Sequence, residues 1–182
     1  MFRSDASEFG LGRYNLISCR AWRFELPVDC RLRTSLNSLE FLACMITIWT
    51  DLLSQGITDE SCLLSQMDST SASGWLHKSN FVDKEDEIVQ LTTAHKLANI
   101  LINSKSCLYS QWFKGDHNAV SDSLSRDFHI PSPNLEFLLK SYVLEQVPFG
   151  LEISPLPDEI DSWSTCLLWN QPLREQWSKE PM

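Results

Sequence analysis

Apolar residues recur at three- and four-residue steps in two long stretches of the chain. In residues 38–53 this spacing predicts an amphipathic helix with one face on a core, and Ser35 or Asn37 is positioned to cap its start. Residues 88–104 repeat the pattern and predict a second long helix. A shorter helix is expected over residues 69–78.

Short stretches that mix β-branched, aromatic and polar residues predict strands. Residues 4–14 are interpreted as a strand end, a turn at Gly10 and Gly12 that uses positive φ, and the beginning of a second strand. The second and third strands are expected over residues 14–19 and 21–26. These three strands are expected to pair antiparallel.

Two further strands follow the first long helix. They are expected over residues 61–67 and 107–113, and a last helix over residues 118–126. The element order is therefore βββαβαβ plus a helix. We predict an α/β fold with a mixed five-stranded sheet, three antiparallel strands followed by parallel ones, flanked by helices.

The composition changes near residue 130. Prolines become frequent beyond this position, and the apolar residues lose a sustained period. We therefore expect a folded domain over residues 1–130. Residues 131–182 are expected to form an extended linker or tail with one short helix near residues 158–169.

Charge and cysteine usage limit the classes of function. The net charge of -9 argues against a basic face that binds nucleic acid. Residues 1–130 carry 12 basic and 16 acidic side chains, so they account for only part of this excess of acidic residues. The longest apolar run, residues 41–49, is far shorter than the roughly 20 residues that span a bilayer, and no apolar signal region is present at the start. The six cysteines include no CxxC pair and are expected to be mostly core thiols. These features predict an intracellular protein without a membrane segment.

Four acidic residues occupy positions suited to a two-metal site, which needs carboxylates that converge from different elements. Asp5 lies on the first strand, Glu40 on the first helix, Asp68 at the end of the fourth strand and Asp122 at the start of the last helix. Taken singly, each has a structural interpretation: Asp5 as a turn former, Glu40 as a solvated helix residue, Asp68 and Asp122 as helix caps. Glu40 stands beside the buried stripe of its helix, and Asp68 follows a buried strand, which favours a functional role.

The sequence around these acids resembles the four acidic motifs of retroelement ribonuclease H domains, in the form found in DIRS-like elements. The resemblance covers about residues 3–130. The matching stretches are, in order, Ser4-Asp5-Ala6-Ser7, Leu39-Glu40-Phe41, Met67-Asp68-Ser69-Thr70-Ser71-Ala72 and Asn118-Ala119-Val120-Ser121-Asp122-Ser123-Leu124-Ser125-Arg126. The last stretch is the most specific of the four.

The resemblance implies a nuclease that cuts the RNA strand of an RNA–DNA hybrid. It implies that Asp5, Glu40, Asp68 and Asp122 bind two Mg²⁺ ions, or Mn²⁺ in their place. Asp68 and Glu40 would hold the first ion, Asp5 would bridge both, and Asp122 would support the second. It also implies a reverse transcriptase domain within the same polyprotein.

Other interpretations remain open at this stage. The chain is alternatively a catalytically inactive ribonuclease H-fold remnant that serves as a connection or binding module. A transposase core shares the fold, but Glu40 argues against it. His117 is interpreted as a surface-loop residue, with a proton-shuttle role as the alternative. Trp75 and Trp112 are interpreted as core residues, with stacking on nucleic acid as the alternative.

Overall fold

The computed structural model describes residues 1–31, 33–55, 61–78 and 86–171. The strands are β1 (Phe2–Ala6), β2 (Gly10–Asn15), β3 (Arg20–Glu25), β4 (Cys62–Met67), β5 (Cys107–Trp112) and β6 (Glu152–Ile153). The α-helices are α1 (Leu36–Gln55), α2 (Thr70–Lys78), α3 (Glu87–Asn103), α4 (Ala119–Arg126), α5 (Ser132–Tyr142) and α6 (Asp158–Trp169). Short 3-10 turns cover Val28–Cys30 and Gly115–His117.

The strands form one mixed sheet in the order β5-β4-β1-β2-β3-β6. β1, β2 and β3 pair antiparallel, whereas β4 lies parallel to β1 and β5 parallel to β4. The predicted α/β class and strand directions are confirmed. The predicted number of five strands is wrong, because the segment after residue 130 adds β6 parallel to β3.

The turn between β2 and β3 falls inside the stretch that the sequence assigned to the second strand. The Asn15 side-chain carbonyl accepts hydrogen bonds from the backbone N–H groups of Ile17 and Ser18 at 2.8 and 3.1 Å, and Cys19 adopts a φ of 57°. This Asx turn reverses the chain although its residues are mostly apolar. The second strand therefore ends at Asn15 instead of continuing to residue 19.

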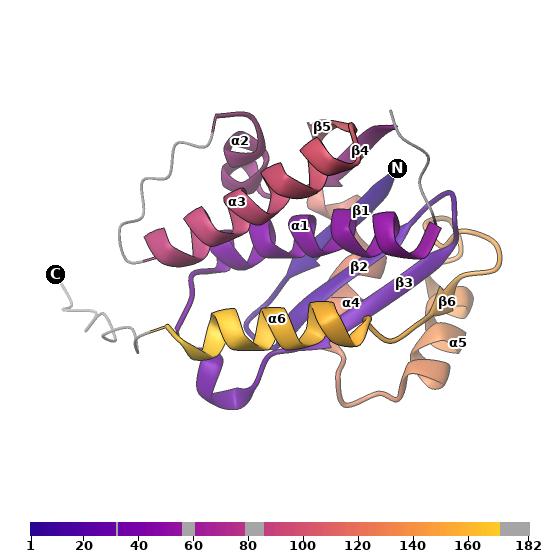
Figure 1. Cartoon of the computed structure of the whole chain (residues 1–182). Coiled ribbons are helices and arrows are strands. Elements are labelled where there is room, and N and C mark those ends of the chain that lie inside the picture. Colours follow the sequence, from indigo (N-terminus) through magenta and orange to yellow (C-terminus); the bar gives the residue numbers. More distant parts are fainter. Residues whose placement is uncertain (32, 56–60, 79–85, 172–182) are drawn as a thin grey trace, which may run out of the picture.

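Helices cover both faces of the sheet. Figure 1 shows α1, α3 and α6 in front of the strands and α4 and α5 behind them. The larger apolar cluster joins α1 to side chains such as Leu11, Trp22 and Met67, and the smaller one joins α4 and α5 to Tyr14 and Ala21. Both faces of the sheet are therefore buried, as expected for a sheet with parallel crossovers.

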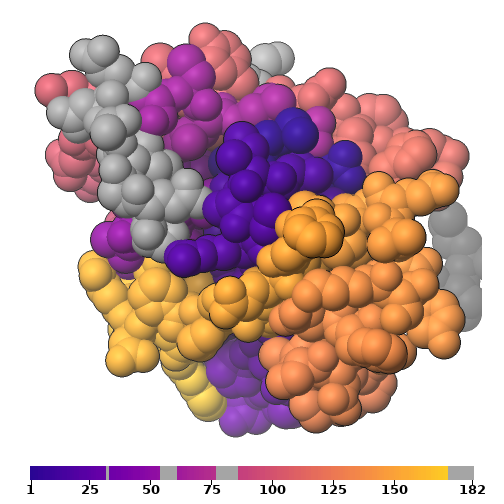
Figure 2. All heavy atoms as spheres, turned by 90° about the vertical axis from the view of Figure 1, so that its right-hand side faces the viewer, coloured from indigo at the N-terminus to yellow at the C-terminus, as the bar shows by residue number. Residues whose placement is uncertain are grey.

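The expectation of an extended tail is wrong for residues 131–171. This stretch contains two helices and β6, and the buried apolar side chains Leu135, Leu139, Ile160 and Leu168 come from it. Figure 2 shows the segment, in orange to yellow, lying against the N-terminal strands in indigo. Its prolines predict a linker, but two of them precede helices in the structure. Pro131 and Pro157 stand at the N-caps of α5 and α6, where proline is compatible with the helix.

Gly12 is needed for close packing and not for a turn. It lies within β2, and a Cβ added there would lie 2.5 Å from the backbone nitrogen of Ser125 and 2.6 Å from atoms of Leu124 in α4. Gly10 is similar, since its Cβ would lie 2.4 Å from the carbonyl oxygen of Phe24. Neither glycine is among the residues with positive φ. The expected turn between the first two strands is present and closes at Gly10, whose carbonyl accepts from the Ser7 backbone N–H at 2.9 Å, but the expectations that the glycines use positive φ and that Gly12 lies in the turn are wrong.

We predict that Gly12→Ala lowers the free energy of unfolding by about 3 kcal/mol or more, because the added methyl group meets backbone atoms that cannot move away. Urea denaturation measures the loss. Gly74→Ala is the matched control, since nothing lies within 4 Å of a Cβ there and Gly74 sits inside α2. The control is expected to stabilise the protein by about 0.5–1 kcal/mol. A Gly12→Ala protein as stable as wild type would contradict the close approach of α4.

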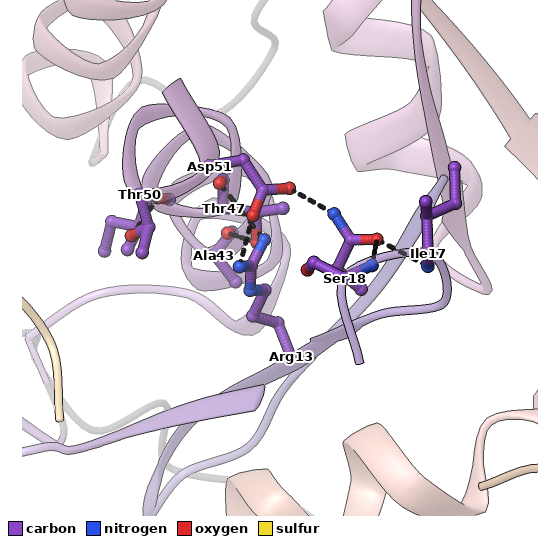
Figure 3. Close-up of polar contacts among 9 residues, drawn as sticks. Arg13, Ile17, Ser18, Ala43, Thr47, Thr50 and Asp51 are labelled. Atoms are coloured by element: carbon purple, nitrogen blue, oxygen red, sulfur yellow. Dashed lines mark hydrogen bonds and ion pairs between the residues drawn. The ribbon is translucent and has the colours of Figure 1, made fainter. Parts of the chain in front are cut away.

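A buried ion pair fastens α1 to the sheet. Arg13 of β2, only 1% exposed, donates to Asp51 of α1 at 2.5 Å and to the backbone carbonyl of Thr47 at 3.2 Å. The Asn15 amide donates to the second carboxylate oxygen of Asp51 at 2.8 Å. Figure 3 shows Arg13 reaching toward Asp51 and Thr47 on one side of the helix. The network fixes both the rotation and the axial position of α1.

α1 is also the one helix in the described part of the chain that is long and apolar enough to cross a membrane. Its window of residues 36–53 is 78% buried inside the protein. A core helix meets the same criteria of length and composition. The finding gives no indication of where the protein resides.

The cysteines differ from the expectation of core thiols. Cys30 and Cys44 are buried, Cys19 is partly buried, and the other three are exposed. All six are free thiols. The difference arises because Cys62 and Cys107 begin strands near the β5 edge of the sheet, where fewer neighbours cover them.

Candidate metal centre

Three of the four predicted acids converge. Asp5, Glu40 and Asp68 each offer a carboxylate oxygen, and these oxygens all lie within 4.8 Å of one another. Asp5 and Glu40 are buried, and Asp68 is half-buried. The convergence of these three acids, which come from a strand, a helix and a strand end, agrees with the sequence prediction.

The topology explains why these three meet. β1 and β4 are parallel neighbours, so Asp5 near the end of β1 and Asp68 directly after β4 reach the same edge of the sheet. α1 begins at this edge, where the backbone N–H of Ser38 donates to the Ser35 hydroxyl at 3.3 Å. Ser35 therefore acts as the predicted N-cap. Glu40, in the second turn of α1, then faces the two aspartates.

Burial and the charges of neighbouring acids raise the pKa values of all three acids. Burial is the largest cause of the rise in the pKa of Asp5 to about 6, and the charges of Asp68 and Asp122 raise it further, while a 2.6 Å hydrogen bond from the Ser125 hydroxyl lowers it. Burial, followed by the charges of Asp5 and Asp68, raises the pKa of Glu40 well above its ordinary value. Burial also raises the pKa of Asp68. Without a cation, the ionised cluster is costly.

The residues of this cluster fit a hard divalent cation. Glu40 contributes a buried carboxylate oxygen, Oε2, that has no hydrogen-bond partner among the described residues. A buried, unpartnered carboxylate oxygen is unfavourable unless a cation or a proton satisfies it. Carboxylate oxygens are the ligands that Mg²⁺ and Mn²⁺ prefer. Asp5, Glu40 and Asp68 therefore form a chemically suitable site for one such ion.

Asp122 lies at the rim and outside this group of three. Its carboxylate accepts from the Arg126 guanidinium at 2.9 Å, one helical turn along α4, and its side chain is 47% exposed. Its charge acts on Asp5 and Asp68, which places it in their vicinity. The structure thus brings Asp122 near the site without making it part of the carboxylate cluster.

Three further residues of the site were not singled out from the sequence. Ser125 donates to Asp5, Asn118 hydrogen-bonds the carboxyl group of Asp68, and Arg126 pairs with Asp122. All three belong to the stretch 118–126, which resembles one of the four acidic motifs. The sequence therefore contains a signal for these residues, although the resemblance assigns a role only to the acid of this motif.

A cavity of about 340 Å³ opens over the cluster. It is lined by Asp5, Glu40, Asp68, Arg126 and the first residues of α1 and α2. Trp112 lies close by, since its indole N–H donates to the backbone carbonyl of Asp68 at 2.9 Å. Trp112 is 54% exposed, so its interpretation as a core residue is wrong. It ends β5, which lies at the edge of the sheet beside β4.

The other sequence-predicted aromatic and histidine positions behave as surface and core residues. Trp75 packs edge-to-face on Phe41 with ring centroids 6.1 Å apart and contacts the main apolar cluster. His117 is exposed on the turn Gly115–His117, in agreement with a surface-loop residue. Its backbone carbonyl accepts a 2.9 Å hydrogen bond from Arg3.

Comparisons with protein-family models, with curated proteins and with solved structures give no match. The function is therefore argued from the geometry of the site and from the four sequence motifs.

We predict that the metal-free protein loses stability as pH rises. Folded Asp5 keeps its proton up to about pH 6, whereas an unfolded aspartate releases it near pH 4. The folded state therefore binds more protons in this window, and Asp5 contributes a loss on the order of 2–3 kcal/mol as pH rises from about 4 to 6. Thermal unfolding in EDTA across pH 4.5–8 measures this loss.

Asp5→Asn removes the titrating group but keeps an oxygen that accepts from Ser125. Above pH 6 the metal-free variant should be more stable than wild type, and its stability should depend less on pH. Mg²⁺ should stabilise wild type at pH 8 and leave the variant almost unchanged. Equal pH profiles for the two proteins in EDTA would contradict the buried, repulsive environment of Asp5.

Proposed function

We propose that the chain is a divalent-metal-dependent endonuclease of the ribonuclease H type, which hydrolyses the RNA strand of RNA–DNA hybrids. The observation that carries this proposal is the convergence of Asp5, Glu40 and Asp68 at one cavity. The strand directions support it, because three antiparallel strands followed by parallel ones are what the resemblance to ribonuclease H domains implies.

The proposed reaction is phosphodiester hydrolysis. A divalent cation at this site would polarise the phosphate and supply the attacking water. The water oxygen forms a bond to phosphorus, the bond to the leaving oxygen breaks, and the proton of the water passes to the leaving oxygen. The overall change needs no oxidant or reductant.

The residues of the chain position the ligands of the ion. Ser125 holds Asp5 by its 2.6 Å hydrogen bond, and Ser125 is itself fixed because its backbone carbonyl accepts from the Ser7 hydroxyl at 2.6 Å. Asn118 orients Asp68 and donates to the Ser4 carbonyl at 3.3 Å. These bonds keep the carboxylates converged despite their repulsion, which is the preorganisation that a metal site requires.

An exposed aromatic residue beside the site suits a nucleic-acid substrate. Trp112 at the end of β5 is 54% exposed, and β5 forms the sheet edge next to β4. The net charge of -9 argues against a strong basic patch. Aromatic side chains can stack on bases without such a patch. The choice of a hybrid over other nucleic acids follows from the sequence motifs.

The experiment is a cleavage assay with end-labelled strands. We expect Mg²⁺- or Mn²⁺-dependent cutting of the RNA strand in an RNA–DNA hybrid, with no cutting of the DNA strand or of duplex DNA. EDTA should abolish the activity. If no cleavage occurs with either metal and neither metal shifts the melting temperature, the alternative of a catalytically inactive connection or binding module is the correct one.

A further inference from the structure

The strongest observation that the proposed function does not use is the position of Arg126. Its guanidinium pairs with Asp122 at 2.9 Å, and its side chain lines the same cavity as Asp5, Glu40 and Asp68. It is the one cationic residue among the described residues that line this cavity. The resemblance to ribonuclease H domains implies that Asp122 supports a second cation, and Arg126 already engages that carboxylate in an ion pair whose side chains are 54% and 47% exposed.

The backbone of Arg126 is held firmly at this place. α4 packs against β2 at Gly12, and Ser125, the residue before Arg126, is bonded to both Asp5 and Ser7. Arg126 ends α4, where the helix dipole favours a cation. The contacts that hold the carboxylates in place, through Ser125 and α4, therefore also hold the backbone of Arg126 next to the site.

The charge of Arg126 reaches the proposed metal ligands. It favours the ionised forms of Asp5 and Asp68, and thereby lowers the pKa of each. A second cation close to Asp122 would meet repulsion from this guanidinium. A planar guanidinium also binds phosphate oxygens through paired hydrogen bonds, so it can supply positive charge at a phosphate without a second ion.

We propose that Arg126 takes the place of the second divalent cation: it neutralises Asp122 and binds the substrate phosphate, and the site works with a single tightly held ion. This inference rests on the proposed nuclease function. Arg126 is the residue that determines how many divalent ions the site binds.

Arg126→Gln is the direct test, with Lys140→Gln as its matched control. Lys140 forms an ion pair of the same i,i+4 kind with Glu136 at 2.5 Å in α5, away from the cavity. Titration with Mn²⁺ alone, followed by the EPR signal of the free ion, counts the ions bound per chain. We expect one ion for wild type and for Lys140→Gln. We expect two for Arg126→Gln, because the freed Asp122 then accepts a second ion.

The metal dependence of hybrid cleavage provides a second readout. Wild type should respond to Mn²⁺ with a Hill coefficient near one. At low Mn²⁺, Arg126→Gln should cut on the order of 100-fold more slowly, and high Mn²⁺ should restore most of the rate with a Hill coefficient above one. A residue with a merely structural role would give a loss that Mn²⁺ does not restore.

The possible results separate this inference from the proposed function. Two ions of similar affinity in wild type, or a single ion in Arg126→Gln, would overturn the role of Arg126 while leaving a metal-dependent nuclease intact. No bound ion in any of the three proteins would overturn both. One ion in wild type and two in Arg126→Gln would support the inference.

Discussion

Replacing Asp68 with asparagine is expected to slow cleavage of an RNA–DNA hybrid on the order of 1000-fold, which corresponds to about 4 kcal/mol of transition-state stabilisation. Asp68 is half-buried at the end of β4, and its carboxylate is one of the three that converge. Asparagine keeps the size and one oxygen but removes the charge that binds the cation. Initial rates with a labelled RNA strand, at saturating hybrid and Mg²⁺, measure the effect.

Folding without metal should be preserved or improved by this change. The pKa of Asp68 is raised by burial and by the charge of Asp122, so its ionised form is unfavourable in the metal-free protein. Asp68→Asn should therefore raise the melting temperature slightly in EDTA and lose most of the gain that Mg²⁺ gives wild type.

Asp161→Asn is the control for the general effect of removing one negative charge, because Asp161 is exposed on α6. Its cleavage rate should equal that of wild type. If Asp68→Asn cuts as fast as Asp161→Asn, Asp68 is not a metal ligand and the nuclease proposal loses its structural basis.

The second large effect is expected at the buried ion pair between β2 and α1. Asp51→Ala should lower the free energy of unfolding by about 3–5 kcal/mol, because it leaves the Arg13 guanidinium buried without a counter-charge. The Asn15 amide loses its acceptor as well. Denaturation by urea at pH 7 measures the loss, and a constant m-value would show that the folded state remains compact.

The double variant Arg13→Met/Asp51→Leu tests the cause of this loss. If the loss comes from an uncompensated buried charge, replacing both partners with apolar residues should recover most of the stability. The half-buried pair of Lys140 and Glu136, whose side chains are 40% and 27% exposed, is the control, and Lys140→Gln should cost about 1 kcal/mol or less. A double variant that is less stable than Asp51→Ala would show that the geometry of the pair, and not the stranded charge, is what α1 needs.

This ion pair also bears on the proposed site. Glu40 and Asp51 lie on the same helix, and Arg13 lies on β2, the strand that pairs with β1 and Asp5. A helix is stiff along its axis, so fixing its far end limits how Glu40 moves relative to Asp5. Loss of the Arg13–Asp51 ion pair should therefore lower the affinity for the metal ion as well as the free energy of unfolding.

Local patterns in the sequence were sufficient for the elements that bear the acids. The three- and four-residue spacing of apolar side chains predicted α1, and short apolar runs predicted β4 and β5. These patterns are informative because one side of a helix or strand faces the core and the other faces solvent. The spacing of apolar residues along the sequence therefore shows which side is buried. The placement of Asp5 on the first strand, Glu40 on the first helix and Asp68 at the end of the fourth strand followed from the same patterns.

Contacts between distant segments do not produce such a local pattern in the sequence. The sequence suggested a turn at Gly12, whereas α4 occupies the space that a Cβ would need, more than a hundred residues along the chain. The turn at Asn15 was missed because a single side-chain oxygen, and not a change of polarity, reverses the chain there. Arg13 lies in a strand whose sequence shows nothing unusual. Its charge is tolerated in the interior because Asp51, from a distant part of the sequence, lies beside it.

The sequence by itself therefore determined the α/β class, the strand directions and four candidate acids, of which three meet. Only the tertiary structure decided that residues 131–171 pack on the sheet, that Asp122 is paired with Arg126, and that Trp112 is exposed. The reason is physical: local periodicity fixes which face of an element is apolar, but the partner that covers this face, or that neutralises a charge, comes from elsewhere in the chain.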